Sequence, residues 1–149
     1  MERRIPWLVG GAVLVVVLGL LAWRGCRQDY ASTPADFTSD GVKLVSPDLD
    51  LALVSVAGVA SDHLTDWSCR FECREKKGCR ADVTAIVHYR SQGRKQTLKL
   101  VGRFDGGAGD VMWLGRAQRP PEIVDRVDRV VLEVVAPFDP AAPLPTPMQ

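Results

Sequence analysis

The residues best suited to chemistry are cysteines and histidines, and three of the four cysteines lie close together as Cys69, Cys73 and Cys79. Thiolates and imidazoles are the usual zinc ligands, so these three with His63 or His88 could form a metal- or redox-sensing site. The spacing C-x3-C-x5-C lacks the C-x2-C pair that commonly presents two thiolates to one ion. A metal- or redox-sensing domain is therefore the alternative hypothesis.

A disulfide is the leading interpretation of the same cysteines. Alternating apolar and polar residues place Cys69 and Cys73 on one face of a strand, about 13 Å apart, whereas a bridge needs Cα atoms roughly 4.4–6.8 Å apart. Cys73 and Cys79 flank a polar loop and could face each other across it. We predict a Cys73–Cys79 disulfide, as suits an oxidising compartment. Cys69 is left to be buried, to pair with Cys26, or to bond to another chain.

Two further motifs contain reactive residue types without the arrangement that chemistry needs. The glycine-rich run from Asp105 to Asp110 fits neither an EF-hand nor a P-loop, and is typical of a connection between strands. The adjacent Ser, Asp and His at 61–63 cannot form a hydrolase triad, because a triad is defined by spatial geometry. We expect a protein that is not an enzyme and that needs no cofactor.

Basic residues are concentrated in the middle of the chain, although the net charge is only +1. Residues 67–103 hold ten lysines and arginines against three acids, whereas residues 28–66 hold seven aspartates against one lysine. The predicted basic, partner-facing patch comprises Arg70, Arg74, Lys76, Lys77, Arg80, Arg90, Arg94, Lys95, Lys99 and Arg103. Such a patch would attract anionic lipid headgroups or an acidic partner surface. With Tyr89 as the aromatic residue at its centre, it does not indicate nucleic acid.

These residues follow a strongly apolar segment, Ile5 to Trp23, that contains no charge. A helix of this length is about 28 Å long, close to the ~30 Å hydrocarbon core of a bilayer. Trp7 and Trp23 lie at its two ends, where indoles anchor at the membrane interface. The sequence predicts a retained single-pass anchor that contacts the lipid bilayer through residues 5–23.

The short N-terminal tail carries Arg3 and Arg4, which favours a cytoplasmic N-terminus. The C-terminal domain is then extracytoplasmic, or periplasmic, at the cell (inner) membrane. We expect an anchor helix over 1–24, a linker over 25–40, a β-domain over 41–136 and a proline-rich disordered tail over 137–149.

The domain shows about seven short strand patterns and no long amphipathic helix. The clearest are Trp67 to Cys73 and Ala81 to Tyr89, where every second residue is apolar, followed by a polar turn at 91–94. Residues 121–131 are ambiguous, and we expect a short turn or helical piece there, followed by a strand. The fold class is mainly β, a small antiparallel sandwich that resembles immunoglobulin or fibronectin domains in general architecture only.

The function expected from these features is that of a membrane-anchored, non-enzymatic interaction or accessory subunit. Its extracytoplasmic domain would bind another envelope protein or a membrane complex, and an open sheet edge would permit strand addition. The partner's identity and the oligomeric state are left open by the sequence.

Overall fold

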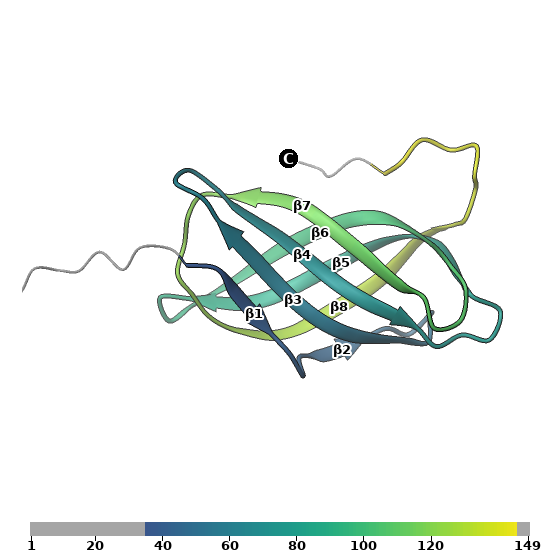
Figure 1. The fold of residues 1–149 in the computed structure, drawn as a ribbon, viewed down its shortest axis with the longest axis horizontal. Coiled ribbons are helices and arrows are strands. Elements are labelled where there is room, and N and C mark those ends of the chain that lie inside the picture. The colour runs from purple at the N-terminus through teal and green to yellow at the C-terminus, as the bar shows by residue number, and fades with distance from the viewer. Residues whose placement is uncertain (1–34, 146–149) are drawn as a thin grey trace, which may run out of the picture. The chain divides into compact units, whose positions relative to one another are not determined.

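The structure, a computed structural model, describes residues 35–145 (Figure 1). This part of the chain contains strands and no helix. The strands are β1 (Phe37–Ser39), β2 (Lys43–Val45), β3 (Leu51–Ala60), β4 (Thr65–Cys73), β5 (Cys79–Ser91), β6 (Arg94–Gly106), β7 (Val111–Arg119) and β8 (Val124–Pro137). The anchor predicted over 5–23, with Trp7 and Trp23, lies outside the described residues. Across 35–145, no helix of the length and apolarity needed to cross a membrane occurs.

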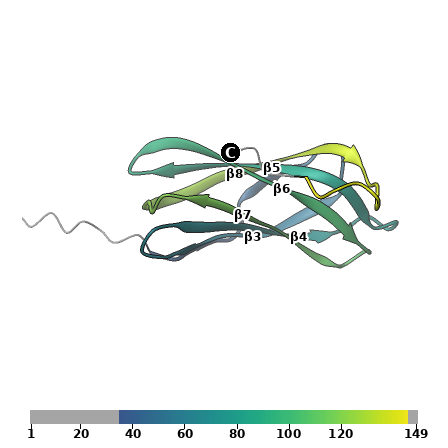
Figure 2. The same cartoon turned by 90° about the horizontal axis from the view of Figure 1, so that it is seen from above.

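The strands form two four-stranded sheets, which Figure 2 shows as two layers seen edge-on. Sheet A has the order β1-β3-β4-β7, and sheet B has the order β2-β8-β5-β6. The prediction of a mainly β fold made of two sheets is confirmed. The expectation of a purely antiparallel sandwich is wrong in one place, because β2 pairs with β8 in parallel. The chain reaches this position by crossing from sheet A to sheet B between β1 and β2, where Gly41 has a φ of +67°.

The sandwich has two distinct ends. At the entry end, where the described chain begins, Ala60 N donates to Asp36 Oδ1 at 2.7 Å, and the β3–β4, β5–β6 and β7–β8 connections lie there (Figure 1). At the disulfide end, Cys73 N donates to Asp110 O at 3.0 Å, joining the β4–β5 and β6–β7 connections.

The core forms because alternate residues of β4 and β5 point inward. The predicted apolar faces of Trp67 to Cys73 and Ala81 to Tyr89 are confirmed, since all their members are buried. At the entry end, the rings of Phe37 and Trp67 lie 4.7 Å apart, and those of Trp67 and Tyr89 lie 4.6 Å apart. Aromatic pairs at these separations add to the burial of apolar surface.

The β5–β6 hairpin turns at Gln92 and Gly93, where φ is +48° and +74°. Two successive positive φ values are the signature of the type I′ turn, which matches the twist of two-residue hairpins. Asp125 Oδ2 accepts a hydrogen bond from Gly93 N at 2.7 Å, so β8 supports the turn. The predicted turn at 91–94 is confirmed.

The expected order of a short turn or helical piece followed by a strand over 121–131 is correct, but its extent is wrong, because the connection is not helical and β8 already begins at Val124. The register of β8 against β5 shifts at three places, and two of them fall in this stretch, where Asp125 and Asp128 are extra residues. These bulges place Val124, Val127 and Val130 opposite inward residues of β5. A spacing of three is helical in appearance, which explains the error.

Two boundaries differ from the ranges expected from the sequence. β1 lies within 25–40, the range expected to be a linker, and β8 extends to Pro137. Beyond β8, the chain lies along β6, since Arg103 Nη1 donates to Ala142 O at 3.0 Å and its guanidinium lies 5.4 Å from the Phe138 ring. Part of the range expected to be a disordered tail therefore contacts the domain.

Candidate interaction surfaces

The predicted disulfide is present, and it is located at one end of the sandwich. Cys73 ends β4, Cys79 begins β5, and their Cα atoms lie 5.9 Å apart. Both cysteines are buried. Because each sulfur is bonded to the other, neither can act as a thiolate ligand in this state, and two of the three cysteines of the metal hypothesis are occupied.

Cys69 is the free cysteine of the described residues, and it is fully buried in the middle of β4. Burial in apolar surroundings disfavours the thiolate and raises the pKa of Cys69 to about 12. The thiol is therefore protonated at neutral pH and is a poor nucleophile or metal ligand. No cluster of three potential metal ligands occurs within residues 35–145.

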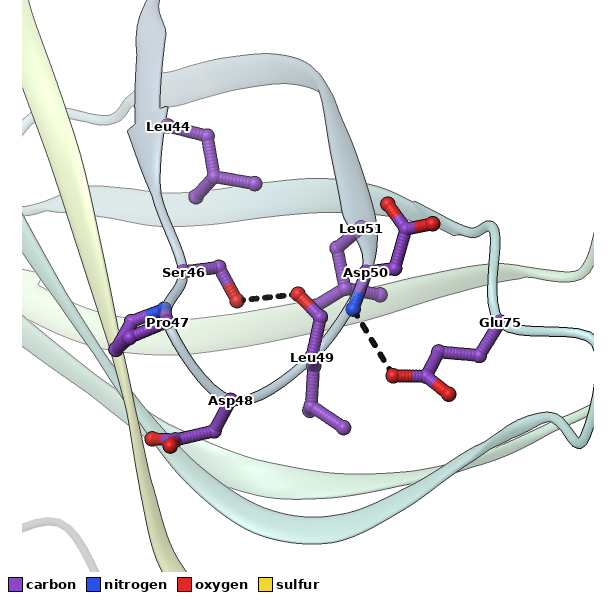
Figure 3. A pocket seen from close by; sticks show the side chains of 8 residues that line it. All are labelled: Leu44, Ser46, Pro47, Asp48, Leu49, Asp50, Leu51 and Glu75. Atoms are coloured by element: carbon purple, nitrogen blue, oxygen red, sulfur yellow. Dashed lines mark hydrogen bonds between the residues drawn. The ribbon is translucent and has the colours of Figure 1, made fainter.

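An acidic hollow of about 410 Å³ lies near the disulfide end, beside the β2–β3 connection (Figure 3). Ser46 Oγ donates to Leu49 O at 2.8 Å, and Asp50 N donates to Glu75 Oε1 at 3.2 Å. In Figure 3 the Asp48 carboxylate points away from those of Asp50 and Glu75. These groups therefore stabilise the loop and do not converge on a ligand.

The structure divides the ten residues of the predicted basic patch into three places. Arg70 lies on β4 in sheet A, with its guanidinium 5.4 Å from the Trp113 ring. A second group lies toward the disulfide end, on the loop after β4 and the adjoining parts of β5 and β6: Arg74, Lys76, Lys77, Arg80 and Arg103. A third group lies on the half of the β5–β6 hairpin nearer its turn: Arg90, Arg94, Lys95 and Lys99.

Ion pairs reduce the positive charge of the group toward the disulfide end. Arg80 lies 3.1 Å from Asp105, and Arg103 Nε lies 2.6 Å from Asp82 Oδ1. Arg103 Nη2 also donates to Asp82 Oδ2 at 2.9 Å, so this pair is bidentate. The hydrogen bonds from Arg103 lower the pKa of Asp82 against the opposing effect of burial.

The third group is joined by basic residues that sequence reasoning missed. On the outer face of sheet B, Lys43 pairs with Arg129, which pairs with His88, and Arg126 pairs with Arg90, which pairs with Lys95. We call the following residues the basic cluster: Lys43, Arg90, Lys95, Lys99, Arg126 and Arg129. Asp128 is the acidic residue within it, bonded to Arg90 at 3.4 Å and to Arg126 at 2.8 Å.

The outer face of sheet A is chemically different. Register places the following residues on it, which we call the sheet A face: Ala52, Ser55, Ala57, Val59, Asp66, Ser68, Arg70, Glu72, Val111, Trp113, Gly115 and Gln118. Most are small or apolar, and three are charged. Trp113 is 62% exposed, Val59 60% and Val111 41%.

Comparisons of the chain with protein-family models, with curated proteins and with solved structures gave no match.

The reactive side chains singled out in the sequence are not brought together among the described residues. His63 lies in the β3–β4 turn of sheet A and His88 on β5 of sheet B, so the two imidazoles belong to different layers. The Ser61 hydroxyl is used in its own turn, donating to Leu64 O at 3.0 Å. In the Asp105–Asp110 connection, Asp110 Oδ2 accepts from Gly107 N at 2.7 Å.

Proposed function

We propose that this chain is a membrane-anchored, non-enzymatic interaction or accessory subunit. In this proposal residues 5–23 span the cell (inner) membrane, with the N-terminus in the cytoplasm. The β-sandwich, of general immunoglobulin- or fibronectin-like architecture, is extracytoplasmic and binds another envelope protein or a membrane complex.

The observation that carries the proposal is the exposure of Trp113 on the sheet A face. A tryptophan exposed to water lacks the favourable free energy that burial of its large apolar surface would provide. Tryptophan is also enriched among the residues that dominate binding energy at interfaces. The Arg70 guanidinium lies over one face of its ring at 5.4 Å, a cation–π contact, and the tryptophan is still 62% exposed. The small neighbours Gly115 and Ser68 keep the surrounding surface flat. The complementary partner surface is apolar and weakly charged.

Strand addition at the edge of sheet A is a weaker binding mode for this domain. Arg116 has a φ of +74° and is the extra residue of a bulge in β7. A bulge twists an edge strand away from a regular ladder and discourages pairing with another chain. The face of the sheet is therefore favoured over its edge.

The test is to purify the full-length protein in a mild detergent and to identify by mass spectrometry the membrane proteins bound in stoichiometric amount. Trp113→Ser is then compared with Val135→Ser, a matched control, because Val135 is also 62% exposed but lies on β8 of sheet B. We expect Trp113→Ser to weaken partner binding by at least about 30-fold, as for an interface hot spot. Val135→Ser should retain the partner.

Both side chains are exposed, so each variant should unfold within about 0.5 kcal/mol of the wild type. A partner that stays bound to Trp113→Ser would exclude the sheet A face as the interface. A full-length protein recovered without any stoichiometric partner would overturn the interaction function itself.

A further inference from the structure

A second surface of the sandwich has the chemistry of an anion-binding site. Three residues of the basic cluster, Arg90, Lys95 and Arg129, line a hollow of about 620 Å³ on sheet B. The hollow is lined by residues of β5, β6 and β8: His88, Tyr89, Arg90, Lys95, Gln96, Thr97, Asp128 and Arg129. Arginine, lysine and histidine groups around a hydroxyl of threonine are typical ligands of phosphate oxygens.

The charge of this surface is not balanced by its neighbours. Among the described residues, the ion-pair partner of the six basic-cluster cations is one carboxylate, that of Asp128, which pairs with Arg90 and Arg126. Asp125, next to Arg126, instead accepts a hydrogen bond from Gly93 N. By contrast, the cations Arg80 and Arg103 at the other half of the same face each have their own aspartate. A surplus of like charges raises the free energy of the isolated domain, and an anionic surface placed against them lowers it.

The cluster spreads across neighbouring strands of sheet B. Lys43, Arg129, His88 and Thr97 are opposite one another on four neighbouring strands, so the row is about 14 Å wide at roughly 4.8 Å between strands. Cations spread over a sheet face match an extended array of charges better than one small ligand in a deep pocket. A bilayer that contains anionic lipids is such an array.

The position of the cluster within the fold fits the same partner. It lies toward the entry end, where the described chain begins, and Figures 1 and 2 both show the β5–β6 turn at that end. Lys99, the cluster residue farthest from the turn along β6, lies five residues after Arg94, or about 17 Å. Residues 24–34, between the predicted anchor and the described domain, can span at most about 40 Å. An anchored domain can therefore reach the bilayer with this surface.

We propose that the basic cluster binds the phosphate groups of anionic lipids in the membrane that holds the anchor. The inference rests on the proposed anchoring, but it uses the outer face of sheet B and needs no protein partner. The domain then contacts the bilayer through sheet B and leaves the sheet A face free.

The chain provides its own reporter for a test, because its two histidines are His88 in the hollow and His63 in the β3–β4 turn. The full-length protein, labelled with carbon-13 in the histidine rings, is kept in a neutral detergent. It is titrated with short-chain phosphatidylglycerol, with phosphatidylcholine of the same chain length, and with inorganic phosphate. We expect phosphatidylglycerol to shift the His88 signals saturably, and more weakly as salt is raised, while the His63 signals stay in place.

Matched variants test whether the basic cluster causes the shift of the His88 signals. The double variant Lys95→Gln/Arg129→Gln should weaken phosphatidylglycerol binding about 30-fold, since one cation near an anionic surface contributes roughly five-fold. Arg80→Gln, on the same sheet but outside the cluster, should leave the affinity within two-fold or so. All of these side chains are exposed, and equal unfolding midpoints in urea will show that the variants are folded.

The other outcomes overturn the proposal. An equal response to phosphatidylcholine, or no response of His88 to phosphatidylglycerol, would exclude anionic lipid and leave an acidic protein surface as the partner. Tighter binding of inorganic phosphate than of phosphatidylglycerol would indicate a soluble phosphate ligand. Alkaline carbonate extraction of membranes reports the anchor separately, so loss of the protein to the soluble fraction would identify failure of the proposed function instead.

Discussion

Asp82 and Arg103 form the least exposed ion pair of the described residues. Both side chains are only 12% exposed, and two hydrogen bonds join them across β5 and β6. Hydrogen bonding to Arg103 lowers the pKa of Asp82, and hydrogen bonding to Asp82 raises the pKa of Arg103. Arg103 also holds the chain after β8 through Ala142 O, so this pair organises three segments.

The lowered pKa of Asp82 predicts how stability depends on pH. A carboxylate whose pKa falls on folding stabilises the native state above its unfolded pKa, about 3.9, and loses this contribution as the pH drops through the lower, folded value. Asp82→Asn should therefore be less stable than the wild type at pH 7, and the difference should shrink below about pH 4. Urea unfolding of the full-length protein, followed by circular dichroism between pH 7 and pH 2, measures it.

Glu133→Gln is the control, because Glu133 is an exposed carboxylate of the same face with no ion pair among the described residues. Its change in unfolding free energy should stay within about 0.5 kcal/mol. If the Asp82→Asn difference keeps its full size at pH 2, the ion pair is not its cause.

At the scale of elements, the disulfide organises one end of the sandwich. The bridge closes the loop 74–78, and Gly78 has a φ of +83° that lets the loop approach Gly106. A Cβ at position 78 would lie 2.6 Å from Gly106 O, so glycine is required at this contact. The β4–β5 and β6–β7 connections therefore depend on one another.

Removal of the bridge should destabilise the domain. Closing a loop of this length contributes about 2 kcal/mol in the chain-entropy account, and the variant also loses two buried sulfur atoms. We expect Cys73→Ala/Cys79→Ala to lower the unfolding free energy by about 2–4 kcal/mol in urea. Cys69→Ala, which removes a buried thiol and keeps the bridge, should cost only about 1 kcal/mol. Equal losses in the two variants would contradict a stabilising role for the bridge.

The elements that could be predicted from the sequence are those with uninterrupted alternation. β4 and β5 contain no shift of inward residues, so the period of two located their faces and, through them, the bridge from Cys73 to Cys79. The first part of β8 was mistaken because bulges at Asp125 and Asp128 replace the period of two by a spacing of three. A bulge depends on the partner strand, which one strand's sequence does not reveal.

The same cause explains what the sequence missed in the basic cluster. Arg126 and Arg129 lie in the misread stretch, and Lys43 reaches the cluster through the parallel pairing of β2 with β8. The predicted patch grouped residues that are close along the chain, whereas the sheets distribute them over two faces and two ends. The number of basic residues correctly indicated a basic surface. Which of them lie together could be known only from the order of the strands in the sheets.

At the scale of the whole domain, the two proposed surfaces lie on opposite layers. Most side chains of the sheet A face are small or apolar and few are charged, and the basic cluster is on the outer face of sheet B. Packed sheets are about 10 Å apart, and the side chains on the two outer faces add to this separation. Changes at sites more than about 7–10 Å apart without shared contacts are usually additive.

Substitutions on one surface should therefore weaken binding at that surface and leave binding at the other unchanged. We expect Trp113→Ser to lose the protein partner and to keep the His88 response to phosphatidylglycerol, and Lys95→Gln/Arg129→Gln to do the opposite. The triple variant should lose both, with a change in unfolding free energy within about 0.5 kcal/mol of the sum. Co-purification, the histidine titration and urea unfolding on the same three full-length proteins measure this. Loss of the partner from the basic variant would mean that lipid contact orients the sheet A face for binding, so that the two surfaces act as one interface.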